Sequence, residues 1–155
     1  MTQRICITGT GRSGTTFLIR ILSLCGLDTG FSREDILKKR HIHKNCNSGL
    51  EFLTDCRTKN SRIPKIIKTP AFILNPQEYI EKYNINQIIL PIRNMSAAAK
   101  SRAKHGKRSG GLWQAKDEKS QILMYQINMS KLWEHIANAD IQCNILSFDK
   151  MISNP

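Results

Sequence analysis

The stretch Gly9-Thr10-Gly11-Arg12-Ser13-Gly14-Thr15-Thr16 decides the fold of this 155-residue chain. It follows a short apolar run, residues 4–8, which is typical of a buried strand. After Thr15 the apolar residues return with a helical period as far as Cys25, and Gly26 is a natural stop for a helix. A glycine-rich loop between a strand and a helix is the setting of a phosphate-binding loop. We therefore expect an anion there, because the main-chain N–H groups and the helix dipole both favour negative charge.

Strands and helices alternate along the rest of the chain. The patterns predict further strands over residues 65–68, 87–92 and 144–148 and helices over residues 32–40, 75–83, 95–105 and 117–137. The last helix carries a stripe of residues expected in the core: Ile122, Tyr125, Met129, Leu132, Trp133 and Ile136. This alternation predicts an α/β, P-loop-type three-layer fold with a central parallel sheet flanked by helices. Because ligands bind at the carboxyl ends of such strands, the loops after Thr8, Lys68 and Ile92 should meet.

The composition indicates an anionic partner. The chain has 24 Lys and Arg against 12 Asp and Glu, a formal net charge of +12. Such an excess suits a nucleotide, a sulfated or phosphorylated acceptor, nucleic acid or a membrane surface. No run approaches the roughly 20 apolar residues of a membrane-spanning helix, so we expect no span.

The cysteines favour a reducing compartment. Five are present without a CxxC pair, and Cys6, Cys25 and Cys143 lie in or beside apolar runs, where they are expected to be small buried hydrophobic residues. No disulfide framework is expected, and this favours a cytoplasmic location.

The loop has the spacing of a nucleoside triphosphate-binding motif, but Thr15 occupies the position of the usual lysine. That lysine normally reaches the β- and γ-phosphates, so its absence argues against an ordinary ATPase or kinase. The cation lies earlier, at Arg12. One cation on the loop crest suits a single 5′-phosphate that carries a transferable group.

Residues 8–18, TGTGRSGTTFL, resemble the 5′-phosphosulfate loop of the sulfotransferases that use 3′-phosphoadenosine 5′-phosphosulfate, in the form found in the tyrosylprotein and bacterial branches. The resemblance implies this donor as co-substrate, adenosine 3′,5′-bisphosphate as product and no metal. It assigns Arg12 to the bridging and leaving oxygens and Phe17 to stacking on the adenine. The donor's 5′ end would be held by Gly11, Arg12, Ser13, Gly14, Thr15 and Thr16.

The donor's 3′-phosphate needs a second anion site. Arg93 follows the third predicted strand, and Ser101 follows Arg93 by eight residues. If Asn94 caps the next helix, Ser101 lies about two turns on and faces the same side. Arg93 and Ser101 could then converge on one phosphate, as an Arg and a Ser with this spacing do in sulfotransferases.

Two weaker matches extend the resemblance from residue 4 to the end, with residues 28–62 unmatched. Lys68 lies where the family has a lysine beside the reaction centre and would neutralise the sulfuryl group. Residues 147–151 resemble the stretch after the family's last sheet strand. The resemblance implies a structural role for them. The resemblance implies that residues 1–155 form a single nucleotide-binding domain that lacks the C-terminal part of the family fold.

The acceptor's hydroxyl or amine needs a general base. The cytosolic branch of the family has a histidine where this chain has Pro70, so that base is missing. Glu51 is the candidate, because some branches place a glutamate between the phosphate loop and the second strand. The competing side chains are Glu34, Asp35, His41 and His43.

Other functions stay open at this stage. His41, His43 and Cys46 offer three metal ligands but lack the usual fourth, so no metal site is expected. A phosphotransferase that uses ATP would need an aspartate for magnesium, whereas the third strand ends at Arg93. A non-catalytic nucleotide- or nucleic-acid-binding module would suit the charge, but no aromatic-interleaved basic surface is present, so nucleic acid is not the expected partner. The sequence does not name the acceptor or the oligomeric state.

Overall fold

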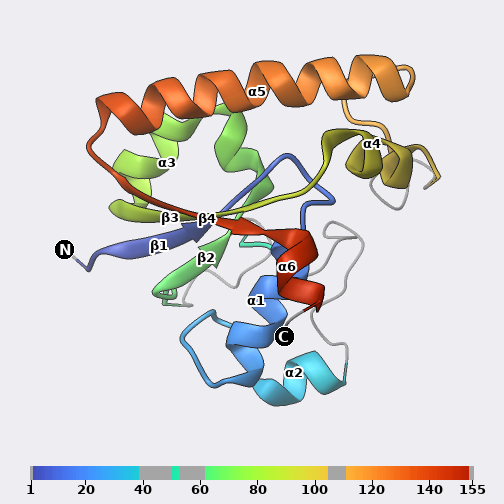
Figure 1. Ribbon diagram of the computed structural model, residues 1–155. Helices are drawn as coiled ribbons and strands as arrows, with labels where there is room; N and C mark the ends of the chain where they lie inside the picture. Colours follow the sequence, from blue (N-terminus) through green and yellow to red (C-terminus); the bar gives the residue numbers. More distant parts are fainter. Residues whose placement is uncertain (1, 39–49, 53–61, 105–110, 154–155) are drawn as a thin grey trace.

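The computed structural model describes residues 2–38, 50–52, 62–104 and 111–153, and it confirms the α/β class. In these residues four parallel strands form one sheet with helices on both faces (Figure 1). The strands are β1 (Arg4–Ile7), β2 (Ile66–Lys68), β3 (Ile85–Ile92) and β4 (Gln142–Ser147), in the order β2-β1-β3-β4. All four predicted strands are confirmed, with shifts of a few residues at their ends.

The strand register sorts apolar side chains onto two faces. Cys6 pairs with Ile67 and Ile88, and these three fully or almost fully buried residues lie in the larger core cluster. Their neighbours Ile7 and Ile66 belong to the second cluster, because successive side chains of a strand point to opposite faces. The sheet is therefore the middle layer between two cores.

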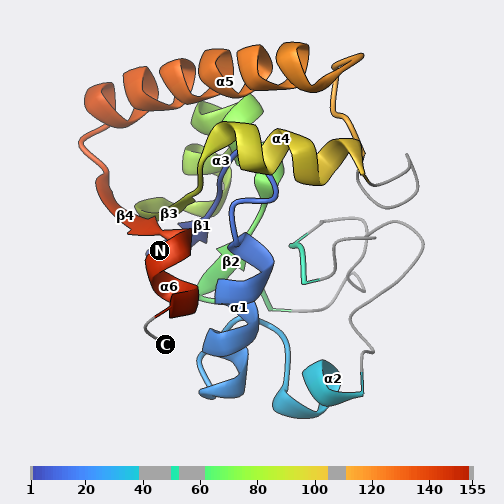
Figure 2. The ribbon, with the colours of Figure 1, turned by 45° about the vertical axis from the view of Figure 1, so that its right-hand side comes forward.

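Each core is closed by its own set of helices (Figures 1 and 2). The larger core packs against the 3-10 helix η2 (Pro70–Leu74), α3 (Pro76–Tyr83) and α5 (Glu118–Asn138). The second core packs against α1 (Thr15–Leu24) and α2 (Arg33–Leu37). Helix α4 (Met95–Ala103) packs on α5, and α6 (Phe148–Ser153) follows β4 directly.

The strand order separates the loop after β1 from the loop after β3. From β1 the chain goes to β2 on one side, and it then passes to β3 on the other side of β1. The connections after β1 and β3 thus leave the sheet in opposite directions, which makes the β1/β3 boundary a topological switch point. A small cavity lies there, lined by Thr10, Pro91, Ile92, Arg93, Met95 and Met129.

Three helices begin at or next to the residues where the sequence predicts their starts. Asn94 accepts from the N–H of Ala97 at 3.0 Å, which confirms it as the cap of α4. Pro76 is the first residue of α3, and Asp117 forms a capping box with Ser120 at the start of α5.

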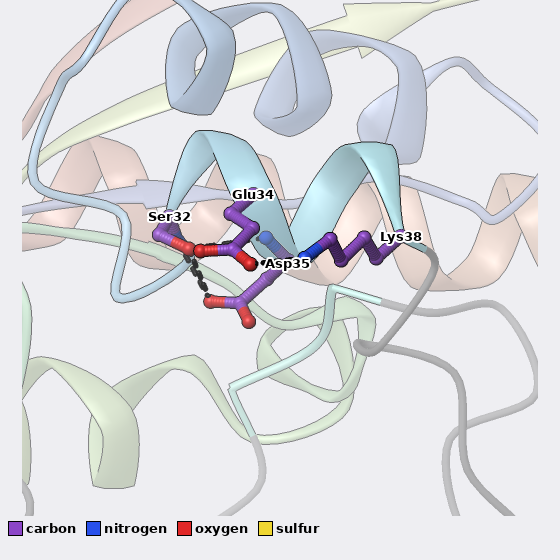
Figure 3. Close-up of polar contacts among 4 residues, drawn as sticks. All are labelled: Ser32, Glu34, Asp35 and Lys38. Atoms are coloured by element: carbon purple, nitrogen blue, oxygen red, sulfur yellow. Dashed lines mark hydrogen bonds and ion pairs between the residues drawn. The ribbon is translucent and has the colours of Figure 1, made fainter.

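Polar side chains at helix α2 and at its N-cap bind one another (Figure 3). Ser32 caps the helix and shares a capping box with Asp35, while Glu34 accepts from Lys38 one turn on. The carboxylates of Glu34 and Asp35 are thus engaged in local helix contacts.

Several expectations need correction. Trp133 lies at the edge of the α5 stripe and is 38% exposed, and Cys25 is exposed because it is the C-terminal cap of α1. The elements η2 and α6 were not predicted. In the described ranges no helix is long and apolar enough to cross a membrane.

Candidate functional site

The carboxyl ends of the four strands carry polar and aromatic side chains into one region. The loop 8–14 follows β1, Lys68 ends β2, Arg93 follows β3 and Phe148 follows β4. The phosphate loop itself follows β1. Contacts described below show that the ends of β2, β3 and β4 meet this loop and the first turn of α1. This is the edge at which a parallel sheet binds ligands.

The phosphate loop presents unsatisfied donors to an anion. Helix α1 begins after Gly14 without a side-chain cap and without an acidic residue in its first turn. Its first N–H groups therefore lack the usual side-chain partner, and the helix dipole adds positive potential. Thr15 is 5% exposed, and the buried Oγ of Ser13 has no hydrogen-bond partner among the described residues. Buried polar groups are rarely left unpaired, so these atoms fit a phosphate group.

The two predicted anion sites adjoin each other. The Nε of Arg12 donates to the Oγ of Ser101 at 3.2 Å. An Nη of Arg93 reaches the main-chain oxygen of Arg12 at 3.5 Å, while the buried Nε of Arg93 has no partner among the described residues. The structure thus places Arg12 in contact with both Ser101 and Arg93. Two guanidinium groups beside one hydroxyl make a strongly cationic cluster, which suits a doubly phosphorylated ligand.

A second cluster joins the loop to β2. The buried Nζ of Lys68 donates to the Oγ1 of Thr16 at 2.9 Å and lies 3.4 Å from a carboxylate oxygen of Glu51. The side chains of Lys68 and Glu51 are 1% and 16% exposed. Lys68 and Glu51, two separate catalytic candidates, are therefore in contact, and the ammonium group of Lys68 reaches the first turn of α1.

Phe148 also lies in this cluster, although only a structural part was expected for its segment. The guanidinium of Arg93 lies over its ring at 4.9 Å, and Phe17 meets the ring edge-on at 6.5 Å. A Cβ on Gly14, whose φ is +101°, would overlap the ring. A larger residue at position 14 would thus collide with Phe148. No turn residue separates β4 from α6, so the sequence offered no signal for this placement.

Two of the competing candidates for the general base lie in α2, and the others are outside the described residues. Glu34 and Asp35 stabilise α2, on the far side of α1 from the sheet (Figures 2 and 3). His41, His43 and Cys46 lie outside the described residues. Among the residues that are described, no group of three His, Cys, Asp or Glu side chains could hold a metal ion.

Comparison with known proteins identifies the family. A family model described as the sulfotransferase domain matches residues 2–155. No curated protein matches the chain by sequence. The family match confirms the resemblance that begins at the phosphate loop.

Proposed function

Because the chain belongs to the sulfotransferase family, we propose that it transfers a sulfuryl group from 3′-phosphoadenosine 5′-phosphosulfate to a hydroxyl or amine of an acceptor. The observation that carries the proposal is the meeting of Arg12, Arg93 and Ser101 beside the phosphate loop. A nucleotide with one phosphate group needs only the loop. A second cationic site next to the loop suits a nucleotide with phosphate groups at both ends of its ribose.

The residues divide the donor between them. The 5′-phosphosulfate would lie on the loop, held by main-chain N–H groups and by the hydroxyls of Ser13, Thr15 and Thr16. The 3′-phosphate would lie between Arg93 and Ser101. Phe17 would stack on the adenine.

The reaction would proceed by in-line attack. The acceptor's oxygen or nitrogen forms a bond to sulfur, and the bond between sulfur and the bridging oxygen breaks. That oxygen leaves with the electron pair on adenosine 3′,5′-bisphosphate, and the acceptor's proton passes to the general base. Arg12 stabilises the charge on the leaving oxygen, Lys68 neutralises the sulfuryl group and Glu51 takes the proton. The position of Glu51 supports this role, because its carboxylate lies 3.4 Å from Lys68, the residue proposed to contact the sulfuryl group.

The alternatives have less support. A phosphotransferase that uses ATP would place an acidic residue for magnesium at the end of β3, where this chain has Arg93. A non-catalytic binding module would not need Glu51 next to Lys68 beside the loop. Both alternatives predict ligands different from those of the proposed enzyme.

Calorimetric titration tests the donor. We expect adenosine 3′,5′-bisphosphate to bind far more tightly than ATP with magnesium. Preference for ATP would favour the phosphotransferase, and binding of neither nucleotide would refute the proposed donor. A screen with the ³⁵S-labelled donor over hydroxyl- and amine-bearing acceptors then tests transfer. Binding of the bisphosphate without transfer to any acceptor and without release of labelled sulfate would favour the binding module.

A further inference from the structure

Arg102 reaches the phosphate loop from α4, next to Ser101. A Cβ atom on Gly11 would overlap the Nη2 of Arg102 and would lie 3.2 Å from its Cζ. Gly11 has a φ of +78°, a conformation that residues with side chains rarely adopt. The guanidinium therefore packs directly against the main chain at the loop crest, in the space that a side chain at position 11 would fill.

The same guanidinium is held from several directions. Its Nε donates to the hydroxyl of Tyr125 at 3.0 Å, and its Nη1 donates to the main-chain oxygen of Gly111 at 2.6 Å. Its Cζ lies 5.6 Å from the centre of the Trp113 ring. Tyr125 is completely buried in α5 against Ala98 and Ala99 of α4. The group that touches Gly11 is thus fixed to the body of the domain.

The chemistry of these contacts requires an arginine. The planar fork presents Nε and two Nη groups in fixed directions, so one side chain can bind Tyr125 and Gly111 while a third nitrogen faces Gly11. A lysine would carry the charge on one nitrogen and could not span these positions. Burial raises the pKa of Tyr125, although the nearby charge of Arg102 opposes the shift. The phenol is therefore neutral at pH 7 and accepts the hydrogen bond without cancelling the positive charge.

We propose that Arg102 is a positioning residue that fixes Gly11, and with it the geometry of the loop that receives the donor's 5′-phosphate. This inference rests on the proposed function, because it concerns the same nucleotide site. It goes beyond that function by assigning a role to a residue outside both predicted anion sites. Ser101 and Arg102 would then act on different ends of the ligand. Ser101 would bind the 3′-phosphate, and Arg102 would fix the shape of the loop that receives the 5′-phosphate.

The two ends of the ligand can be tested separately. Adenosine 5′-monophosphate uses the loop, adenosine 3′-monophosphate uses Arg93 and Ser101, and the bisphosphate uses both. If Arg102 shapes the loop, its loss weakens the binding of ligands that carry a 5′-phosphate. The binding of the 3′-monophosphate should stay unchanged. A general loss of positive charge or of stability would weaken all three ligands.

The experiment is calorimetric titration of the full chain with these three nucleotides. The variants are Arg102→Met, Arg102→Lys and Tyr125→Phe, and Lys100→Met removes an exposed charge from the same helix as a control. We expect both Arg102 variants to bind the two 5′-phosphate ligands about tenfold more weakly, the scale of one lost charged hydrogen bond. Binding of the 3′-monophosphate should stay within about twofold. Tyr125→Phe should shift the 5′-ligands in the same direction by a smaller factor.

Other outcomes overturn the inference. Wild-type binding by Arg102→Lys would show that charge alone matters, and so would an equal loss in Lys100→Met. Equal losses for the 3′- and 5′-monophosphates would indicate a general effect. If the Arg102 variants do not fold, Tyr125→Phe decides, and an unchanged 5′-affinity in it refutes the role. Failure of the wild-type chain to bind the bisphosphate would instead refute the proposed function, on which the inference depends.

Discussion

The Nε of Arg12 donates to the Oγ of Ser101 at 3.2 Å, so the crest of the phosphate loop is joined directly to α4. The two residues are 89 positions apart in the chain and belong to different predicted anion sites. The cation assigned to the 5′ end thus lies against the hydroxyl assigned to the 3′-phosphate. Ser101 accepts from Arg12 through its oxygen, so its own O–H can still donate to a 3′-phosphate. The two ends of the donor should therefore bind in a coupled manner.

Replacement of Arg93 by alanine should selectively weaken the binding of adenosine 3′,5′-bisphosphate. We expect a loss of ~1.5–3 kcal/mol in binding free energy, the usual scale for a hydrogen bond to a charged group. Adenosine 5′-monophosphate should change little, because it lacks the 3′-phosphate. Calorimetry on both ligands checks this, with Arg20→Ala as a control that removes an exposed arginine from α1. Equal losses for both ligands would remove Arg93 from the 3′-site.

Arg12→Ala should affect turnover more than binding. The guanidinium is expected to stabilise charge that develops on the leaving oxygen, and loss of one such donor lowers kcat by about 10²–10³-fold. Because Arg12 contributes less to the ground state, bisphosphate affinity should fall by less than about tenfold. Steady-state transfer rates and calorimetry on the same preparation separate the two effects. An unchanged kcat would exclude Arg12 from the chemistry.

Glu51→Gln should abolish most of the transfer while the donor still binds. The amide keeps the size of the side chain but cannot accept the proton, and a general base contributes typically about 10²–10⁴-fold. The variant also removes the charge beside the buried ammonium of Lys68, so its melting temperature should fall. Rates are therefore measured well below the melting temperature, with Glu134→Gln on the exposed face of α5 as control. Wild-type turnover in Glu51→Gln would show that another group is the general base.

The cysteines at positions 6 and 25 should differ sharply in reactivity. Burial raises the pKa of the Cys6 thiol far above its ordinary value, and the thiolate is the reactive form. Cys25 is exposed at the end of α1. Treatment of the native chain with iodoacetamide at pH 8 should label Cys25 and spare Cys6 until denaturant is added. Peptide mapping by mass spectrometry checks this, and prompt native labelling of Cys6 would contradict its place in the core.

Asp117 should make the stability of the chain depend on pH. Hydrogen bonds from the main-chain N–H and the hydroxyl of Ser120 lower the pKa of this carboxyl group. The folded pKa lies below the unfolded value of about 3.9, so the carboxylate stabilises the fold above that pH. The stabilisation is lost as the pH falls through the folded pKa. The melting temperature of Asp117→Asn should therefore be lower than wild type at pH 7, with a gap that narrows below about pH 4. A gap independent of pH would mean that the charge adds nothing to the cap.

Local signals in the sequence predicted most of the fold. The glycine-rich loop fixed the β1–α1 unit, and Asn94 and Pro76 marked helix starts that the structure confirms. Alternation of strands and helices predicted the parallel sheet. These features depend on neighbours along the chain, so they can be read without tertiary contacts.

The proximity of the candidate residues could be predicted where they follow a strand end. Arg12, Lys68 and Arg93 each follow or end a strand, and parallel strands bring such positions to one edge. The contacts of Phe148 and Arg102 were missed because they depend on tertiary packing. Phe148 meets Gly14 across 134 positions, and Arg102 fills space beside Gly11 that exists only because that residue is glycine. No pattern of hydrophobicity or spacing signals either contact.

A crystal structure of the chain with adenosine 3′,5′-bisphosphate tests the central claim most directly. The account predicts the 5′-phosphate on the loop of residues 11–16 and the 3′-phosphate between Arg93 and Ser101. A bisphosphate bound in the reverse direction, or bound away from the β1/β3 boundary, would contradict it.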